Sequence, residues 1–299
     1  MRVALIGSTG LVGRAIEKQL DVTPFSSKNI SALDPAEFDV CLLATPADVS
    51  RALAPKLTPH TRVIDSSFAF RLDPKVPLII PEINSGLITP EHHLIASPNC
   101  VATILLMVLF PLHKAFGAKR LIGSTYQAAS GGGKKLIDKL FADTKVALTT
   151  KAPTDFGLNL FLHESANEEE QKAVAETQKI LGCPLPISLT CVRVPTLSSH
   201  ALSLHITFEE RPSLEKATAI LNNAPGVSVA PVTPKEASGK TDVFCSRLRE
   251  DPNDSYALEL WVIGDQLMKG SSTNVIQILQ SLQRQSHLSQ GGETQDAHA

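Results

Sequence analysis

Cys100 is a candidate nucleophile because of where it lies in the sequence. It follows Ser97, Pro98 and Asn99 and precedes an apolar run, residues 101–110, that has the character of a buried helix. Beside so many apolar side chains, a cysteine is ordinarily a core thiol. At the first turn of a helix, however, the free N–H groups and the positive end of the helix dipole stabilise a thiolate. The residues around Cys100 leave both interpretations open.

A glycine-rich loop, GSTGLVG, is a second candidate site. It lies between a short apolar run at 2–7 and a helical pattern at 11–20. Glycines permit a tight turn and the close approach of a pyrophosphate, and the following helix offers its N–H groups to the phosphates. A turn whose glycines serve only packing is the alternative. The residues predicted to contact a dinucleotide are Gly7, Ser8, Thr9, Gly10, Leu11, Val12 and Gly13.

Strands and helices alternate over the first hundred residues. A helix is predicted at 11–20 and another between the strands at 38–46 and 61–67. Alternation of this kind is typical of a doubly wound parallel sheet, so the fold class is α/β with a Rossmann-like N-terminal domain. The buried strands are predicted at 2–7, 38–46 and 61–67, and residues 94–100 are predicted to be the end of a strand and a turn.

After about residue 119 the pattern changes to that of an α+β domain. Strands are predicted at 120–130, 187–195, 200–210 and 257–265, and helices at 168–182 and 271–285. We expect the last helix to return to the first domain. The expected division is a dinucleotide-binding domain at 1–100 completed by 266–285, a second domain at 101–265, and a disordered polar tail at 286–299.

The composition excludes several classes of function. The chain has 299 residues, 43% hydrophobic and 19% charged, which is an ordinary globular balance. Its formal net charge of −2 gives no reason to expect nucleic acid or an anionic membrane as a partner. No apolar run reaches the roughly 18 residues of a membrane span. The start of the sequence also lacks the pattern of a signal peptide.

The cysteines indicate a compartment. There are five, an odd number, and none shows CxxC spacing. A disulfide framework or a structural zinc site is therefore not expected, and we predict no metal site. A reducing cytoplasm is the expected localisation, because disulfide-free proteins with scattered cysteines are typical of it.

Several motifs, taken together, resemble the aspartate-semialdehyde dehydrogenase family. They are SPNC at 97–100, STYQAASGGG at 124–133, CVRVPTLSSH at 191–200 and DQLMKGSSTNVIQI at 265–278, and the resemblance runs from residue 1 to about 285. It implies reductive dephosphorylation of 4-phospho-L-aspartate to L-aspartate 4-semialdehyde with NADPH, through a cysteine thioester. The product feeds lysine, diaminopimelate, threonine and methionine synthesis. The resemblance also implies a homodimer and makes 101–265 the catalytic and dimerisation domain.

The resemblance assigns roles to single residues. It makes Cys100 the nucleophile and His200 the general acid/base, whose ordinary pKa lies near neutrality, while Gln127 orients the substrate. The implied substrate-binding residues are Arg71, Asn99, Glu169, Lys172 and Arg193, with aspartyl phosphate and phosphate as ligands. The implied cofactor contacts outside the glycine loop are Ser130, Gly131 and Asn274. Arg193 and His200 can meet at one substrate only if the chain bends, because seven extended residues span about 23 Å.

The sequence also departs from the family pattern. Relatives carry a longer segment after the first helix, whereas residues 21–37 leave room for little more than one short strand. The only basic residue there is Lys28, so the choice between NADP and NAD is open. Asp65 replaces the asparagine of the family's Asn-Ser-Ser stretch. Two alternatives remain: an N-acetyl-glutamyl-phosphate reductase, which Asn99 in place of glycine disfavours, and a non-catalytic relative that acts in protein association.

Overall fold

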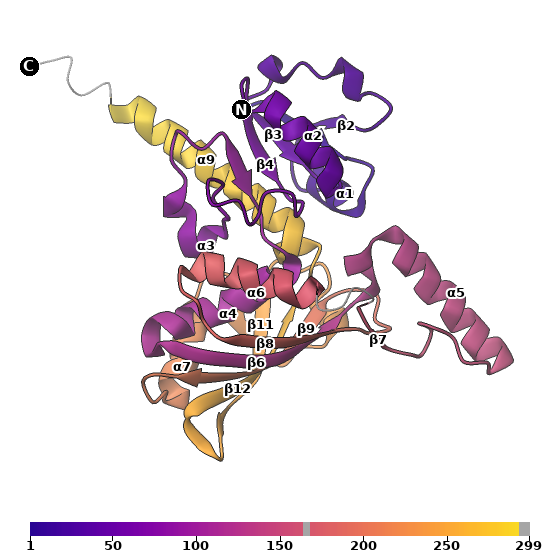
Figure 1. Ribbon diagram of the computed structural model, residues 1–299, viewed down its shortest axis with the longest axis vertical. Coiled ribbons are helices and arrows are strands. Elements are labelled where there is room, and N and C mark those ends of the chain that lie inside the picture. The colour runs from indigo at the N-terminus through magenta and orange to yellow at the C-terminus, as the bar shows by residue number, and fades with distance from the viewer. Residues whose placement is uncertain (164–167, 293–299) are drawn as a thin grey trace, which may run out of the picture. The chain divides into compact units, whose positions relative to one another are not determined.

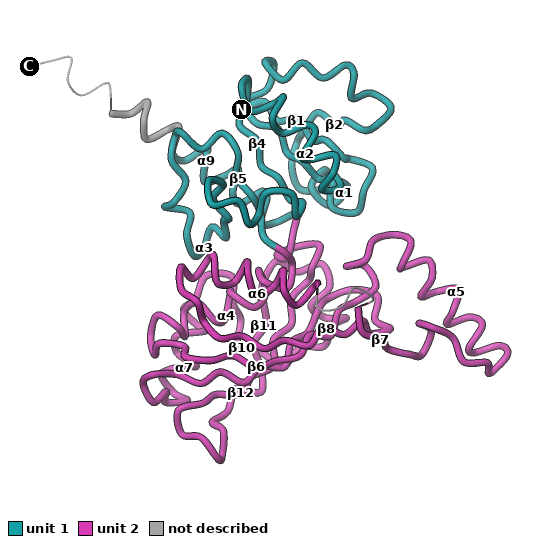
Figure 2. Tube along the Cα trace, viewed as in Figure 1, with its two compact units in different colours: residues 1–98, 272–299 teal, residues 99–271 magenta. Residues whose placement is uncertain are grey.

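The computed structural model describes residues 1–163 and 168–292 and divides into two compact units (Figure 2). Unit 1 contains residues 1–98 and the C-terminal segment from Ser272, and unit 2 contains Asn99–Ser271. Within the described ranges, no helix is both long enough and apolar enough to cross a membrane.

Unit 1 is built on a five-stranded parallel sheet of order β2-β1-β3-β4-β5 (Figure 1). The predicted α/β fold class is confirmed, and the expected single short strand between the first helix and residue 38 is β2. The strands are β1 (Val3–Ile6), β2 (Thr23–Phe25), β3 (Val40–Leu43), β4 (Arg62–Asp65) and β5 (Leu94–Ala96). The helices are α1 (Leu11–Glu17), α2 (Ala47–Leu57), α3 (Pro81–Asn84) and α9 (Thr273–Gly292).

The strands of unit 1 are apolar on both faces, because helices cover both. Val3 and Leu5 of β1 face a core that includes Ile16 of α1 and Ile278 of α9. The intervening strand residues face a second core that includes Leu57 of α2. This arrangement explains why the strands read as continuous apolar runs rather than as alternating ones. The last helix, α9, continues to Gly292, whereas the sequence analysis ends it at residue 285.

Unit 2 is built on a seven-stranded mixed sheet of order β10-β11-β12-β9-β6-β8-β7. Helix α4 contacts α6 and α7 as well as the strands, so the three helices form one layer over the sheet (Figure 1). The strands are β6 (Ala118–Gln127), β7 (Phe161–Leu162), β8 (Ile187–Arg193), β9 (His200–Phe208), β10 (Val227–Val229), β11 (Val243–Asp251) and β12 (Asp254–Gly264). The helices are α4 (Cys100–Phe116), α5 (Lys134–Thr150), α6 (Glu168–Leu181), α7 (Leu214–Asn223) and α8 (Pro234–Ala237).

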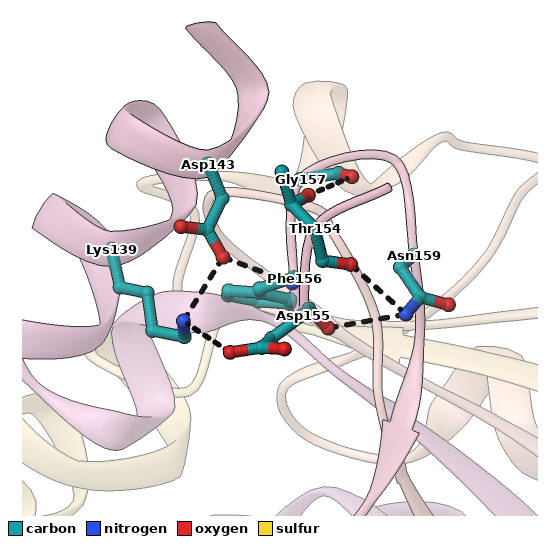
Figure 3. Close-up of polar contacts among 7 residues, drawn as sticks. All are labelled: Lys139, Asp143, Thr154, Asp155, Phe156, Gly157 and Asn159. Atoms are coloured by element: carbon teal, nitrogen blue, oxygen red, sulfur yellow. Dashed lines mark hydrogen bonds and ion pairs between the residues drawn. The ribbon is translucent and has the colours of Figure 1, made fainter. Parts of the chain in front are cut away.

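A polar cluster fixes the loop that leads from α5 to the edge strand β7 (Figure 3). Lys139 of α5 forms ion pairs with Asp143 (3.0 Å) and Asp155 (3.1 Å). Asp143 also accepts a hydrogen bond from the N–H of Phe156 (3.0 Å), whose ring is fully buried. Gly157 lies against the backbone of α5, where a Cβ atom would come within 2.2 Å of Asp143. The loop therefore has a fixed path into β7.

Truncation of Ile278 tests the packing of α9 in unit 1. The side chain is fully buried in the core shared with β1, β3 and β4, so Ile278→Ala is expected to cost about 2–5 kcal/mol of unfolding free energy. Urea unfolding followed by circular dichroism measures this loss. Gln280→Ala on the exposed face of the same helix serves as the control and should leave the midpoint unchanged. An unchanged midpoint for Ile278→Ala would contradict the packing.

Candidate active site

Cys100 is the first residue of helix α4, as expected from the sequence, and it is half-buried. Asn99 caps this helix, because its Oδ1 accepts a hydrogen bond from the N–H of Val101 (2.7 Å). The cap is itself anchored to α6. The N–H of Asn99 donates to the carboxylate of Glu176, and its Nδ2 donates to Glu169 (3.0 Å). Cys100 therefore lies at a helix start, where the positive end of the helix dipole favours a thiolate.

Gly270 lies directly against Cys100. A Cβ atom on Gly270 would come within 2.9 Å of the Cβ of Cys100. Since real Cβ atoms do not approach so closely, any side chain at this position would displace the cysteine. Gly270, in the short π-helix Met268–Ser272, thus brings its backbone against Cys100.

The sheet of unit 2 places Gln127, Arg193 and His200 in one row. Gln127 at the end of β6 is in register with Arg193 of β8. Tyr126 is in register with Ala201 of β9, so the next antiparallel pair joins Gln127 and His200. Because side chains alternate between the faces of a sheet, paired residues share a face. The three side chains therefore lie side by side on neighbouring strands.

The side chains of Arg193 and His200 lie close together, because both approach Gly131. A Cβ atom on Gly131 would lie 2.7 Å from Cε1 of His200 and 3.0 Å from Nη1 of Arg193. The chain thus bends between β8 and β9, as the sequence analysis required. Ser199 in this turn has a positive φ of 68°, a conformation that L-residues adopt only when their surroundings impose it.

His200 is a neutral imidazole in the resting protein. Its side chain is fully buried, and its Nδ1 accepts a hydrogen bond from the N–H of Ala128 (3.1 Å). Burial above all, and then the charges of Arg193 and His163, lower its pKa to about 3. The proton of the neutral ring is therefore on Nε2, which is buried without a hydrogen-bond partner among the described residues. The ordinary pKa of a histidine, near neutrality, therefore does not hold for His200, because burial lowers it.

Arg193 is a buried cation beside the thiol. Its Nη1 donates to the carbonyl oxygen of Ala128 (2.6 Å). Burial lowers the pKa of the guanidinium, and the nearby Cys100 and Glu169 oppose that shift. An arginine side chain remains protonated under such conditions. Arg193 can therefore pair with a thiolate or with a bound carboxylate.

Helix α6 carries two further residues predicted to bind substrate, Glu169 and Lys172. Glu169 lies beside Asn99, whose amide donates to it. Lys172 is mostly buried and forms an ion pair with Glu168 one turn earlier.

The hydroxyl of Ser130 donates to the carbonyl oxygen of Leu197 (2.6 Å) and accepts from the side-chain amide of Gln266. Within the described residues, no group of three or more His, Cys, Asp or Glu side chains gathers as a metal site would require.

The glycine loop of unit 1 has the geometry that a dinucleotide requires. Gly7 has a φ of +91°, and a Cβ atom on it would come within 2.3 Å of the carbonyl oxygen of Ala44. A Cβ atom on Gly13 would likewise come within 2.3 Å of the carbonyl oxygen of Gly7. Helix α1 begins at Leu11, so its first N–H groups have no partner within the helix. The loop and helix start therefore fit a pyrophosphate group.

Two further predicted site residues are held by the backbone of unit 1. Arg71 is buried, and it donates to the carbonyl oxygens of Ser97 (2.8 Å) and Ser66 (2.7 Å). Asn274 of α9 is fully buried and donates to the carbonyl oxygen of Ile79 (2.9 Å) and to Oγ of Ser97 (2.9 Å). Both side chains brace the segment that follows β5.

His163, which was not among the predicted site residues, lies beside the row formed by Gln127, Arg193 and His200. It directly follows β7, and the charges of Arg193, Glu169 and Lys172 all influence its pKa. The only signal in the sequence is a histidine that follows two apolar residues, which is too common a pattern to predict a site.

Selective alkylation tests the environment of Cys100. Burial raises the pKa of the thiols of Cys41, Cys191 and Cys245 to about 12. We expect limiting iodoacetamide at pH 7.5 to modify Cys100 first, because its helix start favours the thiolate. Peptide mass spectrometry measures the order of labelling. Cys183 is the internal control, since it is half-buried but lies outside the site, and faster labelling of Cys183 would contradict the assignment.

Comparison with known proteins agrees with this arrangement. Residues 15–89 match the family description "Semialdehyde dehydrogenase, NAD binding domain", and residues 109–269 match "Semialdehyde dehydrogenase, dimerisation domain". The aspartate-semialdehyde dehydrogenase of Prochlorococcus marinus is 34% identical over 94% of this chain and 96% of that protein. That of Bacillus subtilis is 31% identical over 95% and 98%.

The fold comparison gives the same result. The crystal structure of aspartate semialdehyde dehydrogenase II from Vibrio cholerae superposes with a TM-score of 0.88 at 28% identity, covering 95% of this chain and 98% of that one. A second structure of the Vibrio enzyme is complexed with ASA, and it matches equally well. The chain therefore belongs to the aspartate-semialdehyde dehydrogenase family.

Proposed function

We propose that this chain catalyses the reductive dephosphorylation of 4-phospho-L-aspartate to L-aspartate 4-semialdehyde, a step of amino-acid biosynthesis. The observation that carries the proposal is the position of Cys100 at the start of α4, in the unit whose sheet aligns Gln127, Arg193 and His200. Family membership over nearly the whole chain supports it.

In the first step, Cys100 attacks the acyl phosphate. The thiolate sulfur forms a bond to the acyl carbon, and the bond between that carbon and the phosphate oxygen breaks, which releases phosphate and leaves a thioester. The start of α4 and the charge of Arg193 stabilise the thiolate before attack. Gln127, which is buried and donates to Oγ1 of Thr125 (3.2 Å), can then orient the acyl group.

In the second step, the thioester is reduced and Cys100 leaves as a thiolate. The nicotinamide cofactor, when bound, supplies the hydride. His200 keeps its proton on Nε2 and donates a hydrogen bond to the acyl oxygen while that oxygen carries negative charge. A neutral donor suits this role, because it stabilises the oxyanion without having to be protonated first. In this step the neutral ring of His200 therefore acts as a hydrogen-bond donor, a narrower role than the acid/base function that the family resemblance implies.

Recognition of the substrate follows from the charges around Cys100. Arg193 can bind the α-carboxylate through two parallel hydrogen bonds from its planar guanidinium group. Glu169, held by Asn99, can bind the α-ammonium group. We assign the phosphate to Lys172 and Arg71, the two further cations that the family pattern places at the substrate. Each of these assignments rests on the resemblance as well as on burial and charge.

The proposed cofactor is NADP, bound by the glycine loop, with Ser130, Gly131 and Asn274 on the nicotinamide side. The alignment with the Prochlorococcus relative has 328 positions, more than the 299 residues of this chain, so that relative has segments that are missing here. Strand β2 is followed by Ser26, whose hydroxyl and N–H are paired with Asn29. Ser8, Thr9, Ser27 and Lys28 are the other candidates to contact a 2′-phosphate, and Lys28 is the one among them that carries a positive charge.

We further propose a homodimer in the cytoplasm. The match of residues 109–269 to a dimerisation domain supports self-association of unit 2. The five cysteines form no disulfide in the structure. The two alternative functions have weaker support: the relatives reported above are aspartate-semialdehyde dehydrogenases rather than N-acetyl-glutamyl-phosphate reductases, and a non-catalytic relative would not need the buried Gln127, Arg193 and His200.

Replacement of the nucleophile tests the proposed reaction. Cys100→Ser should lower kcat by at least about a thousandfold, because a serine hydroxyl is far less ionised than a thiol. The assay measures NADPH formation from L-aspartate semialdehyde, phosphate and NADP at 340 nm. Cys183→Ser is the matched control and should retain kcat within about twofold. Full turnover by Cys100→Ser would show that the reaction does not pass through this thiol.

Replacement of Lys28 tests cofactor selection. Loss of one charge-assisted contact of about 1.5–3 kcal/mol lowers affinity by about ten- to a hundredfold. Lys28→Ala should therefore reduce kcat/KM for NADP by about tenfold or more and leave that for NAD unchanged. The unmodified chain should prefer NADP by less than about a thousandfold. An equal effect on both cofactors, or a stronger preference in the unmodified chain, would contradict this prediction; Lys18→Ala is the control.

A further inference from the structure

His163 lies on the face of the sheet that carries the proposed substrate site. Strand β7 pairs antiparallel with β8, with Phe161 opposite Arg193 and Leu162 opposite Val192. Continuing this register places His163 opposite Cys191. Since alternate residues share a face, the imidazole lies on the same side as Arg193, one position further along the edge of the sheet.

The imidazole of His163 has an unused hydrogen-bonding atom. Its Nε2 is fully buried and makes no hydrogen bond to any of the described residues. A neighbouring carboxylate is in the same condition: Glu170 accepts the N–H of Cys191 through Oε1 (2.7 Å), while its buried Oε2 has no partner in the described chain. Burial of unpaired polar atoms is costly, so they are expected where a ligand supplies the missing partner.

The charges around His163 indicate which part of a ligand it would meet. Burial lowers its pKa most, followed by the charge of Arg193, while Glu169 and Glu170 act in the opposite direction. Arg193 and Glu169 are the residues proposed to bind the α-carboxylate and the α-ammonium group. His163 therefore lies among the residues proposed to bind the amino-acid group.

The support of β7 makes this position a fixed one. The preceding loop is held to α5 by the ion pair between Lys139 and Asp155 and by the hydrogen bond from the N–H of Phe156 to Asp143 (Figure 3). The buried ring of Phe156 packs against Phe161 of β7. A histidine that directly follows a strand held in this way can select a ligand, because little backbone freedom is lost on binding.

We propose that His163 is a specificity-determining residue whose Nε2 hydrogen-bonds the amino-acid head of the substrate, meaning its α-ammonium and α-carboxylate groups. This inference rests on the proposed function, since it names a further contact to the same substrate. It gives His163 no part in bond breaking. The contact should therefore affect the binding of the aldehyde substrate and not the chemical step.

Steady-state kinetics of two variants test the inference. His163→Leu removes the hydrogen bond and keeps the bulk, so it should raise KM for L-aspartate semialdehyde by about tenfold or more. Its kcat and its KM for phosphate should stay within about twofold. His163→Gln places an amide near the position of Nε2 and should restore most of the lost affinity. His60→Leu, the same exchange at an exposed position of unit 1, should change nothing.

The possible outcomes separate this inference from the proposed function. An unmodified chain without turnover would overturn both. An active chain in which His163→Leu leaves the aldehyde KM unchanged would overturn the inference alone. Equal rises in both KM values with a lower kcat would indicate a structural role and would also overturn it. A glutamine variant no better than the leucine variant would exclude the hydrogen bond.

Discussion

The capped start of α4 is the constraint on which the active site of unit 2 depends. Asn99 uses its side-chain oxygen to cap the helix, its N–H to bind Glu176 and its side-chain amide to bind Glu169. Glu176 is fully buried, and a buried carboxylate without such a donor would be strongly destabilising. One residue thus joins α4 to α6. The positions of Cys100 and of the carboxylate proposed to bind ammonium are therefore set by the same set of hydrogen bonds.

The register of the sheet is the second constraint, and it brings distant parts of the sequence together. Gln127, Arg193 and His200 belong to three strands, and they become neighbours only because β6 pairs with both β8 and β9. Gly131 packs against the side chains of Arg193 and His200, so closely that a Cβ atom at this position would clash with them. A shift of one residue in either pairing would turn side chains to the opposite face and dismantle the row.

The parts of this arrangement that depend on local sequence could be predicted, and those that depend on pairing could not. Asn99 before an apolar run predicts the helix start at Cys100, because capping is a local preference. The sequence did not predict strand β11, since a bulge and a positive φ at Arg247 interrupt the alternation of its side chains between the two faces of the sheet. The position of His163 follows from a two-residue strand whose partner lies thirty residues further on. The neutral state of His200 follows from burial, which the sequence does not reveal.

Arg193 shows how one buried charge can serve both the resting protein and the reaction. Its positive charge lowers the pKa of His200, in addition to the larger effect of burial, and so keeps that imidazole neutral. The same charge interacts favourably with Cys100, so it favours the thiolate. A cation in this row therefore acts in opposite directions on its two neighbours, because one is charged when protonated and the other when deprotonated. Arg193 thus favours the thiolate form of Cys100 and the neutral form of His200, the two forms on which the proposed reaction depends.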